Sequence, residues 1–221
     1  MKRTILARMI DHTLLKPEAM PAEVERLCAE AAEHCFATVC VNPAYVALSA
    51  SLLKGTGVAV CTVVGFPLGA TPVTVKRFET LQTIDDGATE VDMVIPIGRL
   101  KAGQHDVVRD DIRVLAQTCH DCGALLKVIF ENALLTDAEK VIACQLSVEA
   151  GADFVKTSTG FAKTGATTAD VALMRKAVGP DIGVKAAGGI RSYADALAML
   201  SAGANRLGAS SSLKILAEAE D

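Results

Sequence analysis

Residues 86–95, "DGATEVDMVI", contain the pattern that decides the fold. A Gly-Ala pair precedes a short apolar run, and glycine tolerates the left-handed backbone conformation with which many helices end. The same pair precedes apolar runs at residues 122–130, 150–158 and 202–210. The repeated unit is therefore a helix, a short loop and a strand.

The same reasoning over the whole chain predicts eight strands that alternate with helices. The strands are expected at residues 9–13, 38–42, 58–64, 90–95, 124–130, 153–157, 182–186 and 205–208. Helical patterns are expected at residues 21–35, 75–87, 104–121, 137–150, 168–178, 192–202 and 211–218. The second of these places Val75, Phe78, Leu81 and Ile84 on one apolar stripe.

Eight strands alternating with helices predict an α/β fold, a (β/α)8 TIM barrel, as a single domain over residues 1–221. A doubly wound open sheet remains an alternative, because alternation alone does not show that the sheet closes.

Composition excludes several classes of function. Hydrophobic residues make up 51% of the chain and charged residues 22%, which argues against disorder, and the apolar runs are too short to span a bilayer. A net charge of −4, with no tryptophan, provides neither a basic field nor a stacking platform for nucleic acid. No secretory signal is evident, so a cytoplasmic protein is expected, with no membrane or nucleic-acid partner.

The strand alternation places charged side chains inside the barrel. If the apolar residues of each strand face the helices, Glu90, Asp92, Lys127 and Glu131 face inward, together with Lys156, Lys185 and Asp11. Buried unpaired charges are costly, and these residues fall near strand carboxyl ends, where barrel enzymes place their active sites. A satisfied network of ion pairs is the alternative interpretation.

Two inward lysines on neighbouring strands suggest carbonyl chemistry. Each cation destabilises the other, which lowers an amine pKa toward neutrality and provides a free amine nucleophile. Lys156 and Lys185 are the candidates, and Schiff-base formation is the chemistry expected of them.

Small residues near the last two strands suggest a phosphate site. Gly188 and Gly189 follow one strand, and Gly208, Ser210 and Ser211 lie at the next strand and the start of a helix. Small residues let backbone N–H groups approach a phosphate, and the loops after strands seven and eight form the usual phosphate site of barrels.

No metal site is expected. The pair Cys119 and Cys122 has metal-like spacing but lacks a second pair, and the four histidines do not form a metal-binding spacing. The seven cysteines are expected to be reduced, with Cys40 serving as a small packing residue.

Six segments together resemble the deoxyribose-phosphate aldolase family, which consists of class I barrel aldolases. They are "IDHTLLKP", "EVDMVI", "LKVIFE", "FVKTSTGF", "VKAAGGIR" and "GASS", in this order between residues 10 and 212. The resemblance implies a lyase that reversibly cleaves 2-deoxy-D-ribose 5-phosphate to D-glyceraldehyde 3-phosphate and acetaldehyde in deoxyribonucleotide catabolism. It also implies that no metal or cofactor takes part.

The resemblance also implies roles for individual residues. Lys156 matches the Schiff-base lysine, Lys185 the lysine that lowers its pKa, and Asp92 the proton-transfer carboxylate, with Asp11 and Lys127 in support. The phosphate would lie on Gly160, Gly188, Gly189, Ser210 and Ser211. The chain departs from the family pattern at Lys163 and Thr164 and in "FENALL", and neither departure touches the implied chemistry.

Two other functions remain open from the sequence. One is another Schiff-base aldolase, of the transaldolase type, and the other is a non-catalytic barrel that binds phosphosugars. The expected partners are small phosphosugars and aldehydes, with a homodimer or higher homo-oligomer as a possible assembly.

Overall fold

Eight parallel strands close into a barrel in the computed structural model, which describes residues 1–220. They are β1 (Ile10–Leu14), β2 (Thr38–Val41), β3 (Ala59–Val64), β4 (Glu90–Val94), β5 (Leu125–Ile129), β6 (Phe154–Lys156), β7 (Gly183–Ala187) and β8 (Arg206–Ala209). The barrel closes because β1 pairs with β2 on one side and with β8 on the other. The closed barrel is confirmed, and the doubly wound alternative is wrong.

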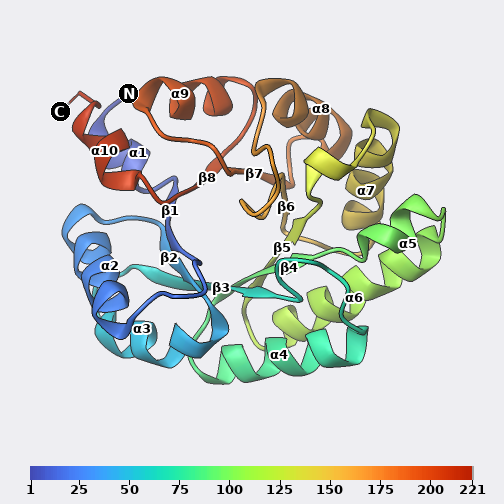
Figure 1. The fold of residues 1–221 in the computed structure, drawn as a ribbon, viewed down its shortest axis with the longest axis horizontal. Helices are drawn as coiled ribbons and strands as arrows, with labels where there is room; N and C mark the ends of the chain where they lie inside the picture. The colour runs from blue at the N-terminus through green and yellow to red at the C-terminus, as the bar shows by residue number, and fades with distance from the viewer. Residues whose placement is uncertain (221) are drawn as a thin grey trace.

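Helices surround the barrel, as Figure 1 shows. They are α1 (Arg3–Ala7), α2 (Pro21–His34), α3 (Val46–Leu52), α4 (Val73–Asp85), α5 (Ile97–Lys101), α6 (His105–Asp121), α7 (Asp137–Glu149), α8 (Thr168–Val178), α9 (Tyr193–Ser201) and α10 (Ser212–Ala217), with short 3-10 turns at Pro43–Tyr45 and Asn132–Leu134. None of the helices within residues 1–220 is long and apolar enough to cross a membrane.

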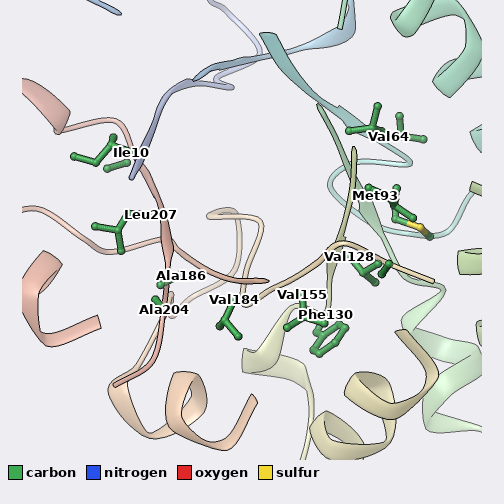
Figure 2. Close-up of a cluster of buried hydrophobic side chains, with 14 of the residues drawn as sticks. Ile10, Val64, Met93, Val128, Phe130, Val155, Val184, Ala186, Ala204 and Leu207 are labelled. Atoms are coloured by element: carbon green, nitrogen blue, oxygen red, sulfur yellow. The ribbon is translucent and has the colours of Figure 1, made fainter. Parts of the chain in front are cut away.

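The hydrophobic core lies between the strands and the helices. Figure 2 shows Met93, Val128, Val184 and Leu207 projecting from their strands toward the surrounding helices, and all four are fully buried. Because side chains alternate along a strand, the residues between them face the barrel interior. The outward apolar face and the inward charged face predicted from the sequence are therefore both confirmed.

The order of the elements is as predicted, with small differences. Each strand boundary lies within one residue of its prediction. The helices α1, α3 and α5 were not predicted, because five to seven residues are too few to establish a helical period.

Helix α4 forms where it was predicted, but three of the four residues of its apolar stripe face away from the barrel, whereas Ile84 packs against the core. The side chains of Val75, Phe78 and Leu81 are 50%, 69% and 37% exposed, whereas the polar residues Lys76, Thr80 and Thr83 are buried. Lys76 donates to the carbonyl oxygen of Val94 (2.9 Å) and to the carboxylate of Asp111 on α6 (2.7 Å). A buried ion pair therefore takes the place of apolar packing beneath this helix.

Candidate active site

Asp92 lies at the centre of the charged barrel interior. One carboxylate oxygen accepts a hydrogen bond from Lys127 (2.7 Å), and the other accepts from Lys156 (2.8 Å) and Lys185 (2.7 Å). Strand register explains the meeting, because Asp92 pairs with Lys127 across β4–β5 and Lys156 pairs with Lys185 across β6–β7. The sequence prediction that these side chains face inward is confirmed.

A second set of ion pairs surrounds this centre. Lys127 also contacts Glu90 (2.6 Å), and Lys185 contacts Asp11. Arg206, on β8, pairs with Asp11 (2.7 Å) and with Glu90 (3.0 Å). No role was predicted for Arg206 from the sequence. Arg206 begins β8, however, and a residue on that strand lies close to the charged residues of the neighbouring strands.

Three carboxylates and four cations thus form one connected network, which we call the interior charge cluster. Its members are Asp11, Glu90, Asp92, Lys127, Lys156, Lys185 and Arg206.

The pKa values in the cluster show which groups remain ionised. Burial alone would raise the pKa of Asp92, but the ammonium groups of Lys127, Lys156 and Lys185 outweigh burial and hold it well below its ordinary value. Burial likewise favours a lower pKa for Lys185, but the carboxylates of Asp11 and Asp92 raise it above its ordinary value. Asp92 is therefore a carboxylate and Lys185 an ammonium ion at neutral pH.

A hollow of about 420 Å³ opens at the carboxyl ends of the strands. Among the residues of the cluster, Lys156 is the one that lines this hollow in the described part of the chain. The phosphate candidates Gly160, Gly188, Gly189 and Ser210 also line it. The hollow therefore joins the amine of Lys156 to most of the predicted phosphate site.

Ser211 differs from that prediction. It lines an adjoining hollow with His12 and Lys214, and Ser210 borders both hollows, as do Thr13 and Leu14. Ser211 lies on the far side of Ser210 because the chain turns there into α10.

Backbone conformation accounts for the glycines of the site. Gly160, Gly188 and Gly189 have φ values of +90°, +86° and +80°, which residues with a Cβ rarely adopt. A Cβ on Gly165 would lie 2.1 Å from the carbonyl oxygen of Gly188. The loops that follow β6 and β7 can therefore touch only because both carry glycine.

Two cationic residues at the hollow were not among the predicted site residues. Lys16 and Arg191 both line it, and both are exposed. They occur in the quoted segments "IDHTLLKP" and "VKAAGGIR", so their nearness to the site could have been inferred. Lys163, a noted departure, is exposed and does not line the hollow.

Glu131 was predicted to face inward, but no role was assigned to it. It follows β5 in a left-handed conformation (φ +59°) and is buried. One carboxylate oxygen accepts hydrogen bonds from the hydroxyl and the backbone N–H of Thr159, a residue that lines the hollow. Its other oxygen has no hydrogen-bond partner among the described residues. Glu131 therefore fixes the loop that follows Lys156.

Two cysteines lie on the inner face beside Asp92. Cys40 and Cys61 are paired in register across β2–β3, and both pack with Leu15 and Val63, so the packing role predicted for Cys40 is confirmed. The sulfur of Cys61 lies 3.2 Å from a carboxylate oxygen of Asp92.

Two groups of the described residues could offer ligands to a metal, and each combines carboxylates of the interior charge cluster with the cysteines beside it. One group is Cys40, Cys61 and Asp92, and the other is Asp11, Cys61 and Glu90. The carboxylates of both groups are already paired with ammonium or guanidinium groups, whose charge opposes a metal cation. These residues fit a network of ion pairs better than a metal centre.

Comparisons with known proteins agree with this geometry. The family model for DeoC/LacD family aldolases matches residues 5–218. The deoxyribose-phosphate aldolase of Streptococcus suis is 60% identical, with 96% of this chain and 95% of that protein covered. The corresponding protein of Clostridium kluyveri is 57% identical, with coverage of 98% and 99%.

A solved structure extends the likeness to three dimensions. The tetrameric deoxyribose phosphate aldolase of Aeropyrum pernix superposes with a TM-score of 0.92 at 36% identity, covering 98% of this chain and 91% of that one. With a family model and relatives that span nearly the whole chain, the protein belongs to the deoxyribose-phosphate aldolase family.

Proposed function

We propose that this protein reversibly cleaves 2-deoxy-D-ribose 5-phosphate to D-glyceraldehyde 3-phosphate and acetaldehyde through a Schiff base on Lys156. The observation that carries the proposal is the position of Lys156, which lines the hollow while its neighbours Asp92 and Lys185 lie buried behind it. The relatives at 57–60% identity support the choice of substrate.

Lys156 is the nucleophile in this proposal. Lys185 stays protonated and shares a carboxylate oxygen of Asp92 with Lys156. The neutral amine of Lys156 adds to the aldehyde carbon of the substrate, water leaves, and an iminium ion forms.

Asp92 acts as the proton-transfer group. The iminium nitrogen withdraws the electron pair of the bond between C2 and C3, while Asp92 accepts the proton of the C3 hydroxyl through a water molecule. Glyceraldehyde 3-phosphate departs, leaving an enamine on Lys156. Protonation of the enamine at C2 and hydrolysis of the resulting iminium release acetaldehyde and regenerate the amine. Asp92 carries the proton between these steps, while Lys127 holds Asp92 in place and Asp11 holds Lys185.

The phosphate binds at the glycine-lined side of the hollow. Backbone N–H groups at Gly160, Gly188, Gly189 and Ser210 can face a bound phosphate without obstruction by side chains. Lys16 and Arg191 at the rim supply positive charge.

We also infer that the whole chain, residues 1–221, is one aldolase domain that assembles as a homo-oligomer. The family match over residues 5–218 supports the single domain, although Asp221 lies outside the described residues. The relative from Aeropyrum pernix is a tetramer, which supports an assembly of identical copies.

Borohydride trapping tests the mechanism. The protein is incubated with acetaldehyde and reduced, and the modified peptide is mapped by mass spectrometry. We expect a two-carbon adduct on Lys156 that disappears, together with turnover, in Lys156→Ala. Lys163→Ala is the matched control, because that lysine is exposed outside the hollow and its loss should leave the adduct intact.

Two outcomes would contradict the proposal. An active enzyme with unmodified Lys156 would show that another group is the nucleophile. Trapping by a ketone donor in preference to acetaldehyde would point to an aldolase of the transaldolase type.

A further inference from the structure

His12 is a buried histidine that the proposed reaction does not use. It lies on β1 two residues after Ile10, which Figure 2 shows projecting toward the surrounding helices, so both side chains share the outer face of the strand. Only 3% of His12 is exposed, and its ring packs against Phe36 with the ring centroids 4.9 Å apart. A buried polar ring costs free energy unless its nitrogens find hydrogen-bond partners.

Both ring nitrogens of His12 have partners, and the partners come from two different helices. Nε2 lies 2.8 Å from a carboxylate oxygen of Glu30 on α2, and Nδ1 lies 3.0 Å from the hydroxyl of Ser212, the first residue of α10. Burial lowers the pKa of His12 although the Glu30 carboxylate favours a higher one, so the ring is neutral at neutral pH. Because a carboxylate only accepts, Nε2 carries the ring proton and Nδ1 accepts from the Ser212 hydroxyl.

Ser212 also closes the turn that leads from β8 into α10. Its hydroxyl oxygen lies 2.9 Å from the carbonyl oxygen of Ala209, which ends β8 and is paired in register with His12. Two residues, Ser210 and Ser211, lie between these anchors. Ala209 and Ser210 line the hollow that receives the substrate, so the anchored turn forms part of its wall.

We propose that His12 is a positioning residue for the substrate phosphate: through Ser212 it fixes this turn so that the backbone N–H of Ser210 faces the phosphate group. The inference rests on the phosphate site of the proposed function. His12 acts from behind that site, because it lines the adjoining hollow with Ser211.

A positioning role differs from a purely structural one in the substrates that it affects. The turn lies on β8 and α10, whereas the amine that attacks the aldehyde is on β6. Loss of the contact between His12 and Ser212 should therefore weaken binding of the phosphate group and leave the chemistry at Lys156 in place. General loosening of the barrel would instead impair phosphorylated and unphosphorylated substrates alike.

Comparison of 2-deoxy-D-ribose 5-phosphate with 2-deoxy-D-ribose tests the proposal. We expect His12→Leu to raise KM for the phosphorylated sugar roughly 10-fold, which is the effect of about one hydrogen bond, with a smaller change in kcat. For the unphosphorylated sugar, kcat/KM should change less than about twofold on the same scale. Isothermal titration calorimetry with inorganic phosphate should show the same rise of roughly 10-fold in Kd.

Two further histidine variants separate the contact from the side chain. An asparagine at position 12 has a polar atom where Nδ1 lies, so His12→Asn should keep the contact with Ser212 and recover most of the phosphate affinity. His120→Leu is the matched control, because His120 also pairs with a carboxylate, that of Asp153 (3.0 Å), but at the amino end of β6. This control should leave the Kd for phosphate unchanged.

Ser212→Ala keeps the test decisive if His12→Leu fails to fold, because it removes one hydroxyl group. It should weaken phosphate binding as much as His12→Leu does, and the double variant should bind no more weakly than either single variant, because all three lack the same contact.

Several results would overturn the proposal. They are a wild-type protein that binds no inorganic phosphate, an unchanged Kd in folded Ser212→Ala, an equal loss of kcat/KM for both sugars, and additive losses in the double variant. A wild-type protein that binds phosphate in a His12-dependent manner but cleaves neither sugar would instead count against the proposed function alone.

Discussion

Replacing Asp92 with asparagine would test both the chemistry and the electrostatics of the interior charge cluster. Asparagine has nearly the same shape but no charge, and Asp92 accepts hydrogen bonds from three ammonium groups. Lys127 would keep Glu90 and Lys185 would keep Asp11, but Lys156 would lose the carboxylate with which it pairs in the described part of the chain. One of the three lysines is therefore left without a counter-ion.

The loss of stability in Asp92→Asn follows from the one lysine that is left without a counter-ion. Removing one partner of a buried ion pair costs about 3–5 kcal/mol, and the lower end applies because Lys156 lines the hollow. A loss of about 3 kcal/mol lowers the Tm of a chain of this length by roughly 6–12 °C. Loss of the proton-transfer group lowers kcat by about 100-fold to 10,000-fold.

Acid should reduce the difference in stability between the two proteins. The lysines hold the pKa of Asp92 well below its ordinary value, so the native state binds fewer protons than the unfolded state as the pH falls below about 4. The stability that the carboxylate contributes is present above that pH and is lost as the pH falls through the native pKa. Asp92→Asn has no such group, so the two free energies of unfolding should converge in acid.

Three measurements on the same variant check these expectations. They are urea unfolding as a function of pH, steady-state turnover, and borohydride trapping with acetaldehyde, which should still modify Lys156. Turnover within tenfold of the wild-type rate would refute the proton-transfer role of Asp92. A difference in stability that stays constant into acid would refute the ionised state of the buried carboxylate.

Three other substitutions test the supporting structure. Glu131→Gln weakens the hydrogen bonds that fix Thr159. KM for the phosphosugar should therefore rise about 10-fold, with a smaller change in kcat. A fall in kcat alone would contradict the role of Glu131 in positioning this loop. Gly188→Ala places a residue with a Cβ in a left-handed backbone conformation, so the free energy of unfolding should fall by about 1–2 kcal/mol. Inhibition by inorganic phosphate should also weaken. An unchanged inhibition constant would count against the proposed phosphate site. Lys76→Met leaves Asp111 buried without its partner and should cost about 3–5 kcal/mol in urea unfolding, most of which the further change Asp111→Leu should recover. No recovery would show that the loss does not come from an unpaired Asp111.

The strands and the inward charges could be predicted because both depend on the alternation of side chains between the two faces of a strand, which repeats every two residues. Alternation along β4 assigns Asp92 and Met93 to opposite faces, and the apolar residue must face the helices. Parallel pairing then brings the inward residues of neighbouring strands together, which is why Lys156 and Lys185 could be expected to meet.

Other features depend on contacts that no local pattern records. The apolar stripe of α4 was the usual sign of a buried face, but Lys76 reaches Val94 and Asp111, which lie 18 and 35 residues away in sequence. The partners of Arg206 lie even further along the chain. Ser211 was assigned from its place beside Ser210, although the turn into α10 directs it toward another hollow.

The balance of charge inside the barrel argues for a catalytic role over a purely structural one. A network that served stability alone could be replaced by apolar side chains, often without loss. Here four cations face three carboxylates, so the fully ionised cluster carries one excess positive charge. Of the three lysines in the cluster, Lys156 lines the hollow, while Lys127 and Lys185 are buried beneath it. The cluster therefore holds Lys156, which shares one oxygen of Asp92 with Lys185, at the position where a substrate aldehyde can reach it.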